Sequence, residues 1–349
     1  MDISGSLALV TGGAGFIGSR LAAALLARGC RVRVLDTEMA AGRIEIVRGD
    51  VRDPGTWARA LPEVDFVFHM AAAIGADTDA RRYLDVNAGG TVELYHALES
   101  VTSRVRKVVV ASSLGVYGEG TYRCESDGLQ HPELRPLAQL QRGEWEPSCP
   151  ACGRGLTAVP TDEGATPAPV SAYGVSKLAA ERLALLMGRR LDVPTAVLRY
   201  SVVYGPGQSL ANPYSTVITA FATRLCRGEA PTLYEDGEQQ RDWVFVDDVV
   251  RAILLAAGDE RAAFEVFNVG SGTGRSVREL AEHLGRRLGR DLALEPSQRY
   301  RVGDYRHLVL DITKMRALGF EPAVSLAEGL DLFVRGLDSV GTGSVLGRI

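Results

Sequence analysis

Three features are scarce in this sequence of 349 residues: long apolar runs, an excess of positive charge, and lysine. The longest apolar runs, such as residues 21–27, fall far below the roughly 20 residues of a membrane-spanning helix, and no charged-then-apolar leader opens the chain. The 39 basic residues are outnumbered by 43 acidic ones, and the net charge of −4 argues against a nucleic-acid or anionic-membrane partner. We therefore expect a cytoplasmic protein that binds neither.

The composition is typical of a soluble globular protein. Hydrophobic residues make up 46% of the chain and charged residues 23%, which disordered and collagen-like chains do not share. Among the 39 basic residues only Lys107, Lys177 and Lys314 are lysine. A lysine that falls in a chemical pattern is therefore more informative here than usual.

The first 200 residues alternate short β-branched runs with helical patterns, which is typical of βαβ units and a parallel sheet. The predicted strands are residues 7–11, 31–36, 44–47, 65–69 and 107–112. The predicted helices are residues 15–28, 79–100 and 172–190. The sequence thus predicts an α/β protein with a doubly wound parallel sheet.

After residue 200 the pattern loosens into loops rich in glycine and proline, which indicates a smaller C-terminal lobe built onto the sheet. We assign residues 1–200 and 236–260 to the sheet domain, 201–235 and 261–335 to the lobe, and 336–349 to a tail. Residues 118–169 do not fit the alternation: they hold three of the five cysteines and show no strong periodicity. We interpret them as an insertion in the sheet domain.

Three glycines, Gly12, Gly15 and Gly18, stand three apart between the first predicted strand and helix. In that context the first glycine makes a tight turn, the second lets the backbone approach a pyrophosphate, and the third lets helix pack on strand. Asp36 ends the second strand, where a carboxylate binds both ribose hydroxyls and repels a 2′-phosphate. The pattern predicts a Rossmann-type domain that binds NAD rather than NADP; the alternative is a glycine turn with only packing duties.

Other candidate cofactor contacts follow from their places near this loop. They are Phe16 and Ile17 at the start of the first helix, Asp50 and Val51 after the third strand, and Ala71 and Ala73 after the fourth.

Tyr173 and Lys177 stand four apart in a predicted helix, so both side chains project from one face. With 11 tyrosines and three lysines in the chain, chance predicts about 0.1 such pair. An ammonium beside a phenol stabilises the phenolate and makes it a general base near neutral pH. Ser113, at the carboxyl end of the fifth strand, could hydrogen-bond the same substrate hydroxyl. The alternative is a surface Tyr/Lys pair and a strand-ending serine.

With these motifs in order, the chain resembles the extended short-chain dehydrogenases/reductases of the nucleotide-sugar epimerase and dehydratase type. The matching segments are TGGAGFIG at 11–18, Ser-Ser-x-x-Val-Tyr-Gly at 112–118, YGVSK at 173–177, LRYSVVYGPGQ at 198–208 and EDGEQQRDWVFVDDV at 235–249. The resemblance covers about residues 5–320. It implies that residues 1–200 bind NAD, that the lobe binds a nucleotide-diphosphate sugar, and that Ser113, Tyr173 and Lys177 (the last two also touching NAD) are catalytic.

The same resemblance implies substrate contacts and an oligomeric state. Arg241 and Arg301 would bind the phosphates of the sugar nucleotide, and Asp304 its ribose. The other candidate substrate residues are Asn212, Tyr234 and Leu308. Leu308 matches a position where related 4-epimerases often carry a tyrosine that limits sugar size, and Val202 stands where an asparagine usually touches the diphosphate. Members of the family often form homodimers through helices that correspond to 79–100 and 172–190; the alternative is a monomer.

The two residues that follow Ser113 distinguish between the reactions that members of this family catalyse. Dehydratases of this type place an Asp-Glu pair there and decarboxylases a Glu at the second position, whereas this chain has Leu114 and Gly115. Without these acids we predict a C4 epimerase that works through a transient 4-keto sugar with NAD kept bound. The alternatives are a nucleotide-sugar 4-ketoreductase or dehydrogenase and, as a different class, a non-catalytic NAD-binding regulator.

The insertion contains a possible metal site. Tyr117 and Tyr173 are 56 residues apart, which is roughly 35 more than the family usually has. Cys149 and Cys152 form a CxxC pair whose thiolates could bind a structural zinc together with Cys124. Two fourth ligands stay open, Asp127 and His131. The alternatives are a redox CxxC or unligated thiols. A subgroup of 4-epimerases for deoxysugars such as dTDP-rhamnose carries a similar insertion.

Overall fold

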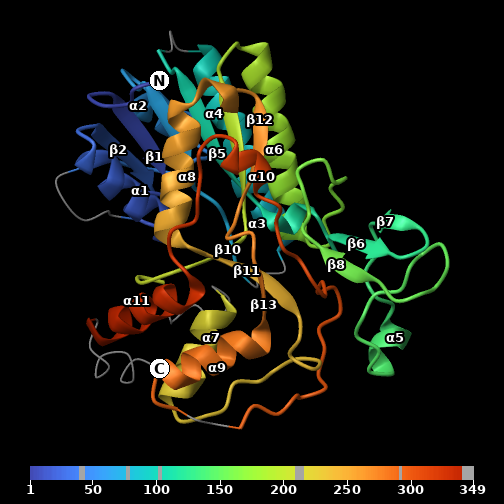
Figure 1. Cartoon of the computed structure of the whole chain (residues 1–349). Helices are drawn as coiled ribbons and strands as arrows, with labels where there is room; N and C mark the ends of the chain where they lie inside the picture. Colours follow the sequence, from blue (N-terminus) through green and yellow to red (C-terminus); the bar gives the residue numbers. More distant parts are fainter. Residues whose placement is uncertain (39–43, 76–78, 101–103, 209–215, 291–292, 340–349) are drawn as a thin grey trace.

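The computed structural model describes residues 1–38, 44–75, 79–100, 104–208, 216–290 and 293–339. Within them seven strands form one sheet in the order β12-β9-β5-β4-β1-β2-β3 (Figure 1). Every neighbouring pair in this sheet is parallel. The strands are β1 (Leu7–Thr11), β2 (Arg31–Asp36), β3 (Glu45–Arg48), β4 (Phe66–His69), β5 (Lys107–Ser113), β9 (Thr195–Tyr200) and β12 (Glu265–Val269). The order reverses at β1, so the predicted doubly wound α/β sheet is confirmed.

Helices cover both faces of this sheet because its strands are apolar on both sides. Ala8 and Val10 of β1 pack with α1 (Phe16–Ala27) and α8 (Val246–Gly258). Leu7 and Leu9 face the opposite core. That second core includes α2 (Pro54–Ala60), α4 (Gly90–Ser100) and α6 (Ala172–Arg190). The sheet therefore holds its carboxyl-end loops on a rigid three-layer body.

The helix predicted over residues 79–100 is interrupted. It consists of α3 (Ala80–Tyr83), a π-helical turn η1 (Leu84–Gly89) and α4. A π-helical turn inserts extra residues into the helix and often marks a functional position. Here the turn contains Asn87, which is 2% exposed and faces the carboxyl end of β4. The prediction for residues 172–190 matches α6.

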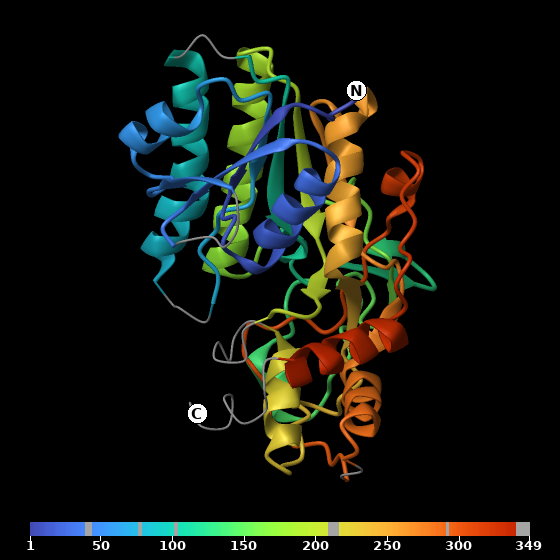
Figure 2. The same ribbon diagram turned by 90° about the vertical axis from the view of Figure 1, so that its left-hand side faces the viewer.

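The lobe contains a small sheet of its own. β11 (Gln240–Phe245) pairs in parallel with β10 (Val202–Tyr204) and antiparallel with β13 (Gly274–Ser276). The lobe's helices are α7 (Val217–Cys226), α9 (Val277–Arg287) and α11 (Leu326–Ser339), and Figure 2 shows them gathered below the sheet domain. The remaining short helices of the C-terminal part are η3 (Glu260–Ala262) and α10 (Thr313–Arg316).

The structure differs from the assigned boundaries at two strands. β12 lies inside residues 261–335 but completes the main sheet by pairing with β9. β11 lies inside residues 236–260 but pairs within the lobe's sheet, while its Val244 and the helix α8 pack into the main core. Both strands are short, so their sequence indicates a strand without indicating which sheet it joins.

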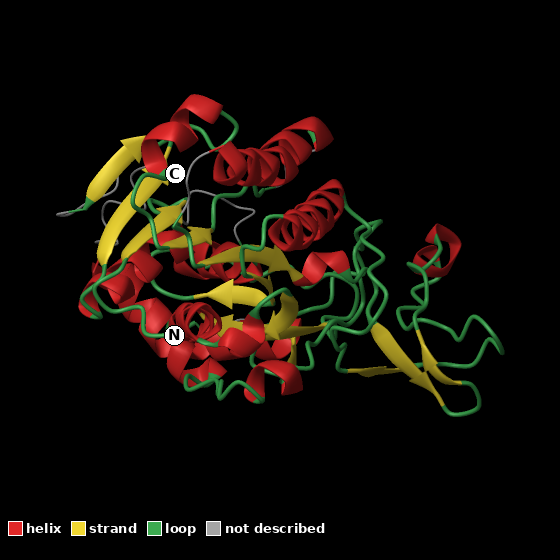
Figure 3. Cartoon of the chain, turned by 90° about the horizontal axis from the view of Figure 1, so that it is seen from above, coloured by secondary structure: helices red, strands yellow, loops and turns green. Residues whose placement is uncertain are grey.

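The insertion has a regular structure that its sequence did not indicate. β6 (Thr121–Cys124) pairs antiparallel with β7 (Gly128–Gln130) and with β8 (Thr157–Val159). The short helix η2 (Leu114–Val116) precedes β6, and the short helix α5 (Leu137–Gln141) follows β7. Figure 3 shows the insertion extending to one side of the main body.

Candidate functional site

The glycine loop leaves the N-terminus of α1 open. Gly12 has a φ of +68°, and a Cβ there would lie 2.8 Å from the Cα of Ala71. A Cβ on Gly18 would overlap the carbonyl oxygen of Gly12. Gly15 precedes the helix without a side-chain cap, and the first turn carries no acidic residue. The first N–H groups of α1 are thus available to an anion such as a pyrophosphate.

Asp36 lies at the end of β2 beside this loop. One carboxylate oxygen accepts a hydrogen bond from the backbone N–H of Ala14 at 2.9 Å, and the other from that of Glu38 at 3.1 Å. These bonds fix the carboxylate next to the segment that would hold the pyrophosphate. The position suits a ribose-binding acid.

The predicted contacts after β3 are already engaged within the protein. Both carboxylate oxygens of Asp50 accept bonds from Arg52, and this pairing lowers the pKa of Asp50. The carbonyl oxygen of Val51 accepts a bond from the indole of Trp57 at 2.7 Å. The Asp50 carboxylate and the Val51 carbonyl are therefore held in place by other residues of the protein.

Buried polar side chains hold the backbone after β4. Ala71 donates its N–H to the hydroxyl of Thr11 at 3.0 Å. Ala73 donates to the Asn87 oxygen at 2.7 Å, and the Asn87 amide nitrogen donates to the Ala73 carbonyl and to Ser176. Sequence reasoning missed Asn87; a buried amide on the inner side of a helix is the signal that could have found it.

Ser113 and Tyr173 come together at the carboxyl end of β5, and Lys177 lies on the same helix as Tyr173. The hydroxyl of Ser113 hydrogen-bonds to the Tyr173 phenol and also accepts the N–H of Gly115 at 3.1 Å. Lys177, one turn further along α6, is 4% exposed. The ring of Tyr83 packs edge-on against Tyr173 with centroids 5.9 Å apart. The carboxyl end of β5 and the face of α6 that carries Tyr173 therefore meet.

The protonation of this trio differs from the sequence expectation. Burial raises the pKa of Tyr173 to about 12, and only the bond to Ser113 lowers it. Burial also lowers the pKa of Lys177 to about 8. We expected the ammonium to bring the phenol toward neutral pH. In the protein without NAD, desolvation is the largest effect on both groups and shifts each of them toward its neutral form.

Gly115 lies beside the reacting groups. A Cβ on this residue would lie 3.5 Å from the Ser113 oxygen and 3.8 Å from the Tyr173 ring. Leu114, in contrast, is 5% exposed and packs into the main core. An acidic side chain at position 115 would face the substrate, so its absence removes a proton donor from this part of the site.

Arg241 lies on β11 with its guanidinium directed at the segment 304–308. It donates to the carbonyl oxygens of Tyr305 and Arg306, both at 2.9 Å, and pairs with the carboxylate of Asp304 at 3.4 Å. Its guanidinium also stacks on the Tyr305 ring, 4.2 Å from the centroid. Two of the predicted substrate residues, Arg241 and Asp304, are thus adjacent.

The other substrate candidates fall into three groups. Arg301 stacks on the ring of Tyr234 at 4.6 Å, so these two lie together. Leu308 is 1% exposed and packs against Gly120, which leaves it no surface toward a sugar. Its suggested role in sugar size is therefore not supported by its position. Asn212 lies outside the described residues.

Four side chains of the insertion form a compact cluster whose ligand atoms all lie within 4.8 Å of one another. They are Cys124, Asp127, Cys149 and Cys152. The thiols of Cys124 and Cys149 donate to one Asp127 oxygen at 3.2 and 3.4 Å. His131 lies outside the cluster, with its ring nitrogen 3.4 Å from the Thr121 hydroxyl. His131 is thus not part of this cluster, whereas the turn from β6 to β7 returns Asp127 to the cysteines.

Comparison with known proteins places this geometry in context. The model of the NAD dependent epimerase/dehydratase family matches residues 8–138 and 148–270. The chain is 34% identical to the dTDP-L-rhamnose 4-epimerase of Burkholderia thailandensis, with 94% of each chain covered. It is 33% identical to the UDP-glucose 4-epimerase of Mycolicibacterium smegmatis, over 92% of this chain and 95% of that one.

Solved structures agree with these matches. The UDP-glucose 4-epimerase of Thermotoga maritima with UDP-glucose superposes with a TM-score of 0.79 at 31% identity, covering 96% of this chain and 99% of that one. The UDP-glucose 4-epimerase of Thermus thermophilus in complex with NAD gives 0.76 at 31% identity, with the same coverage. Within the described residues, no helix has the length and apolar character needed to cross a membrane.

Proposed function

The chain belongs to the NAD dependent epimerase/dehydratase family, and we propose that it inverts C4 of a nucleotide-diphosphate sugar with NAD kept bound. One observation carries the choice of reaction. Ser113 and Tyr173 meet beside Gly115, a position without an acidic side chain. The site offers oxidation at one carbon but no acid for elimination or decarboxylation.

Tyr173, Ser113 and Lys177 each have one role in the proposed reaction. Tyr173 accepts the proton of the C4 hydroxyl, Ser113 holds the same oxygen, and the Lys177 charge favours the phenolate. Bound NAD supplies the hydride acceptor and donor, so no net redox change results. Because burial holds the pKa of Tyr173 at about 12, a second positive charge near the phenol would assist its ionisation. The open glycine loop and Asp36 would hold the dinucleotide.

The substrate contacts are proposed from the lobe. Arg241 and Arg301 carry the positive charge that a diphosphate requires, and Asp304 offers a carboxylate for ribose hydroxyls. The relatives named above act on dTDP-L-rhamnose and UDP-glucose, so these two nucleotide sugars are the first to test.

The test of the reaction uses purified protein, each nucleotide sugar, and deuterated water. We expect reversible formation of the C4 epimer without added NAD and without accumulation of NADH. The product should gain no solvent deuterium at C4, because the hydride returns to the carbon it left, and none at C3 or C5. Solvent label at C5 would indicate dehydration or 5-epimerisation instead, and stoichiometric NADH consumption would support the reductase alternative.

We also propose that Cys124, Asp127, Cys149 and Cys152 bind one structural zinc ion. Three thiolates and a carboxylate form a donor set that zinc accepts in tetrahedral geometry. Two of the ligands, Cys124 and Cys149, lie in the insertion's small core, where a metal would join β6 to the CxxC turn. The role is structural because all four positions are filled by the protein.

Metal analysis tests this proposal directly. We expect one zinc per chain in the wild type, loss of zinc in Cys149→Ser, and full zinc in the matched control His131→Ala. Chelation should expose residues 118–169 to proteolysis. Wild-type protein that contains no zinc, or a Cys149→Ser protein that keeps it, contradicts the proposal.

Two properties of the whole molecule complete the proposal. We propose a homodimer formed through α4 and α6, because Val175 and Leu186 of α6 are 46% and 64% exposed and apolar. A Leu186→Glu protein should then run as a monomer in sedimentation. We also propose a cytoplasmic location, because none of the five cysteines forms a disulfide, as expected in a reducing compartment. Cell fractionation tests it.

A further inference from the structure

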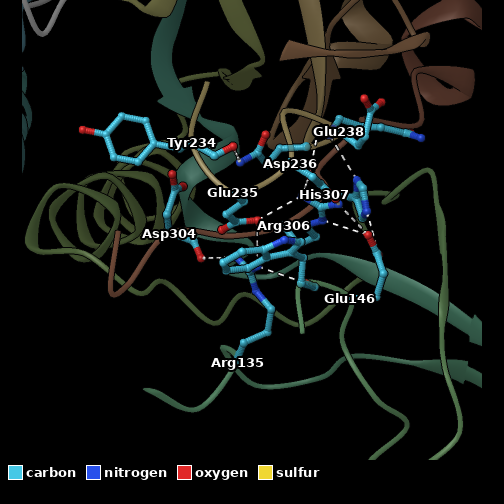
Figure 4. Close-up of polar contacts among 12 residues, drawn as sticks. Arg135, Glu146, Tyr234, Glu235, Asp236, Glu238, Asp304, Arg306 and His307 are labelled. Carbon is cyan, nitrogen blue, oxygen red and sulfur yellow. Dashed lines mark hydrogen bonds and ion pairs between the residues drawn. The ribbon is translucent and has the colours of Figure 1, made fainter. Parts of the chain in front are cut away.

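The segment 304–308 lies where the lobe meets the insertion. On the lobe side Arg241 donates to its backbone at Tyr305 and Arg306 and pairs with Asp304. Figure 4 shows the other side of the segment, where residues of the insertion and of the loop before β11 converge on Arg306. The position of Asp304 therefore depends on contacts from both parts.

Three side chains of the insertion bind the backbone of this segment directly. Arg135 donates to the carbonyl oxygen of Asp304 at 3.2 Å. Glu119 accepts the N–H of Arg306 at 2.7 Å. The hydroxyl of Tyr122 accepts the N–H of His307 at 3.2 Å. Together they fix three of five consecutive residues, and none of the three contacts is within the lobe itself.

A charge cluster centred on the buried side chains of Arg306, Arg135 and Glu235 adds to these contacts. Arg306 is 1% exposed and pairs with Glu235 and Asp236, at 2.9 and 2.8 Å, and with Glu146 of the insertion at 2.7 Å. Arg135 shares the same Glu235 oxygen at 3.0 Å. A charge removed from such a cluster leaves its partners unpaired in a low dielectric. The cluster thus holds insertion and lobe in one relative arrangement.

The same segment is joined to the cysteine cluster through one residue. Tyr122 is 0% exposed and packs with Cys124, Cys149 and Leu156 in the small core of the insertion. Its hydroxyl donates to Glu119 at 2.8 Å. One side chain, that of Tyr122, therefore connects the core around the cysteines to the segment 304–308.

We infer that the insertion is part of the binding site for the nucleoside diphosphate of the substrate, because it fixes the backbone that presents Asp304 and docks Arg241. Arg135 and Tyr122 are positioning residues that act through the segment 304–308 and do not touch the reacting atoms. The inference rests on the proposed function, in which this segment receives the ribose and phosphates.

Calorimetric titration of UDP and of dTDP tests the inference, together with the separation of KM from kcat. Arg135→Met keeps the volume of the side chain and leaves Glu235 paired with Arg306. We expect the Kd for the nucleoside diphosphate and the KM for the sugar nucleotide to rise about tenfold, the scale of one lost charge-assisted hydrogen bond. The value of kcat should stay within about twofold and the NAD content should not change.

The matched control is Arg142→Met in the same insertion. Arg142 pairs only with Glu144, and both side chains are more than half exposed, at 58% and 56%. It should leave the Kd unchanged. If Arg135→Met does not fold, Tyr122→Phe removes one hydroxyl from the same path, and we expect its Kd to rise about threefold.

The results distinguish a failure of this inference from a failure of the proposed function. Wild-type protein that binds a nucleoside diphosphate, with an unchanged Kd in Arg135→Met or in a folded Tyr122→Phe, overturns the inference alone. The inference is also overturned if kcat falls equally in Arg135→Met and Tyr122→Phe while the Kd for the nucleoside diphosphate stays constant. Wild-type protein that binds neither UDP nor dTDP would overturn the proposed substrate class and the inference with it.

Discussion

The buried ion pair beneath the catalytic residues gives a sharp stability prediction. Glu181 of α6 is 1% exposed and Arg199 of β9 is 3% exposed. Arg199 donates to the two carboxylate oxygens at 3.0 and 2.5 Å, and Ser112 donates to the same carboxylate at 3.1 Å. Arg199 also donates to the Tyr117 hydroxyl at 2.7 Å. Glu181 is the carboxylate that pairs with this desolvated guanidinium, and Glu181→Gln removes its negative charge.

The expected loss is about 3–5 kcal/mol in the free energy of unfolding, which is the range for breaking a buried pair on one side. The matched control is Glu99→Gln, whose partner Arg190 is at 2.9 Å with both side chains exposed, at 63% and 42%. Exposed pairs contribute about 0–1 kcal/mol, because water and salt screen them. Because both variants replace Glu with Gln, the difference between their losses of unfolding free energy measures the effect of burial.

Urea unfolding followed by circular dichroism supplies both values. Glu181 is one turn after Lys177, and Ser112 precedes Ser113, so the Glu181→Gln protein should also lose turnover in proportion to the disorder of these elements. A loss below about 1 kcal/mol, equal to that of the Glu99→Gln control, would refute the reasoning, because it would mean that Arg199 finds water or another acceptor at no cost.

Three further changes test the cofactor and catalytic residues. Asp36→Ala should weaken NAD binding, measured by fluorescence titration, more than any substitution in residues 118–169, and wild-type protein that uses NADP equally well would contradict the assignment. Tyr173→Phe should reduce epimerisation at least about a hundredfold while NAD stays bound, and near-normal turnover would show that the base lies elsewhere. Gly18→Ala places a Cβ against the Gly12 carbonyl oxygen, so a loss of about 1–3 kcal/mol in unfolding free energy and of NAD content is expected; unchanged melting would show that the loop shifts freely.

Local patterns in the sequence predicted the parts of the site that lie close along the chain. The glycine loop depends on one strand, one turn and one helix, and Asp36 ends the strand that follows them. The Tyr173 and Lys177 spacing depends on a single helix face. The fourth member of the cysteine cluster could be narrowed to two residues by spacing alone. Only the antiparallel pairing of β6 with β7 decides for Asp127, because pairing brings the turn back onto the cysteines.

Contacts between distant segments could not be predicted. Arg135 and Glu235 are 100 residues apart, and Arg306 and Glu146 are 160 apart, so no periodicity links them. For the same reason the sequence did not indicate that β12 joins the main sheet. The pKa values of Tyr173 and Lys177 could not be predicted for a different reason: spacing shows that two side chains share a face, but burial, which shifts their pKa values, depends on everything that packs around that face.

The burial of Lys177 also has a cost to stability that can be measured. Burial alone lowers its pKa from 10.5 to about 8. The folded protein therefore binds this proton less tightly than the unfolded chain does, and below about pH 8 the charged lysine disfavours folding by about 3 kcal/mol. Between about pH 8 and pH 10.5 the unfolded chain holds the proton that the folded protein has released, so this penalty shrinks as the pH rises and is absent above that range.

Lys177→Met should accordingly stabilise the NAD-free protein by about 3 kcal/mol at pH 7, and by progressively less toward pH 10.5, while abolishing turnover. The difference between variant and wild type cancels the other titrating groups, so urea unfolding of both proteins at each pH isolates the lysine. A stabilisation that does not change with pH would mean that methionine only packs better than lysine. Destabilisation at pH 7 would mean that the ammonium has a partner in the fold, and would remove the argument that this charge is kept buried for the reaction rather than for the structure.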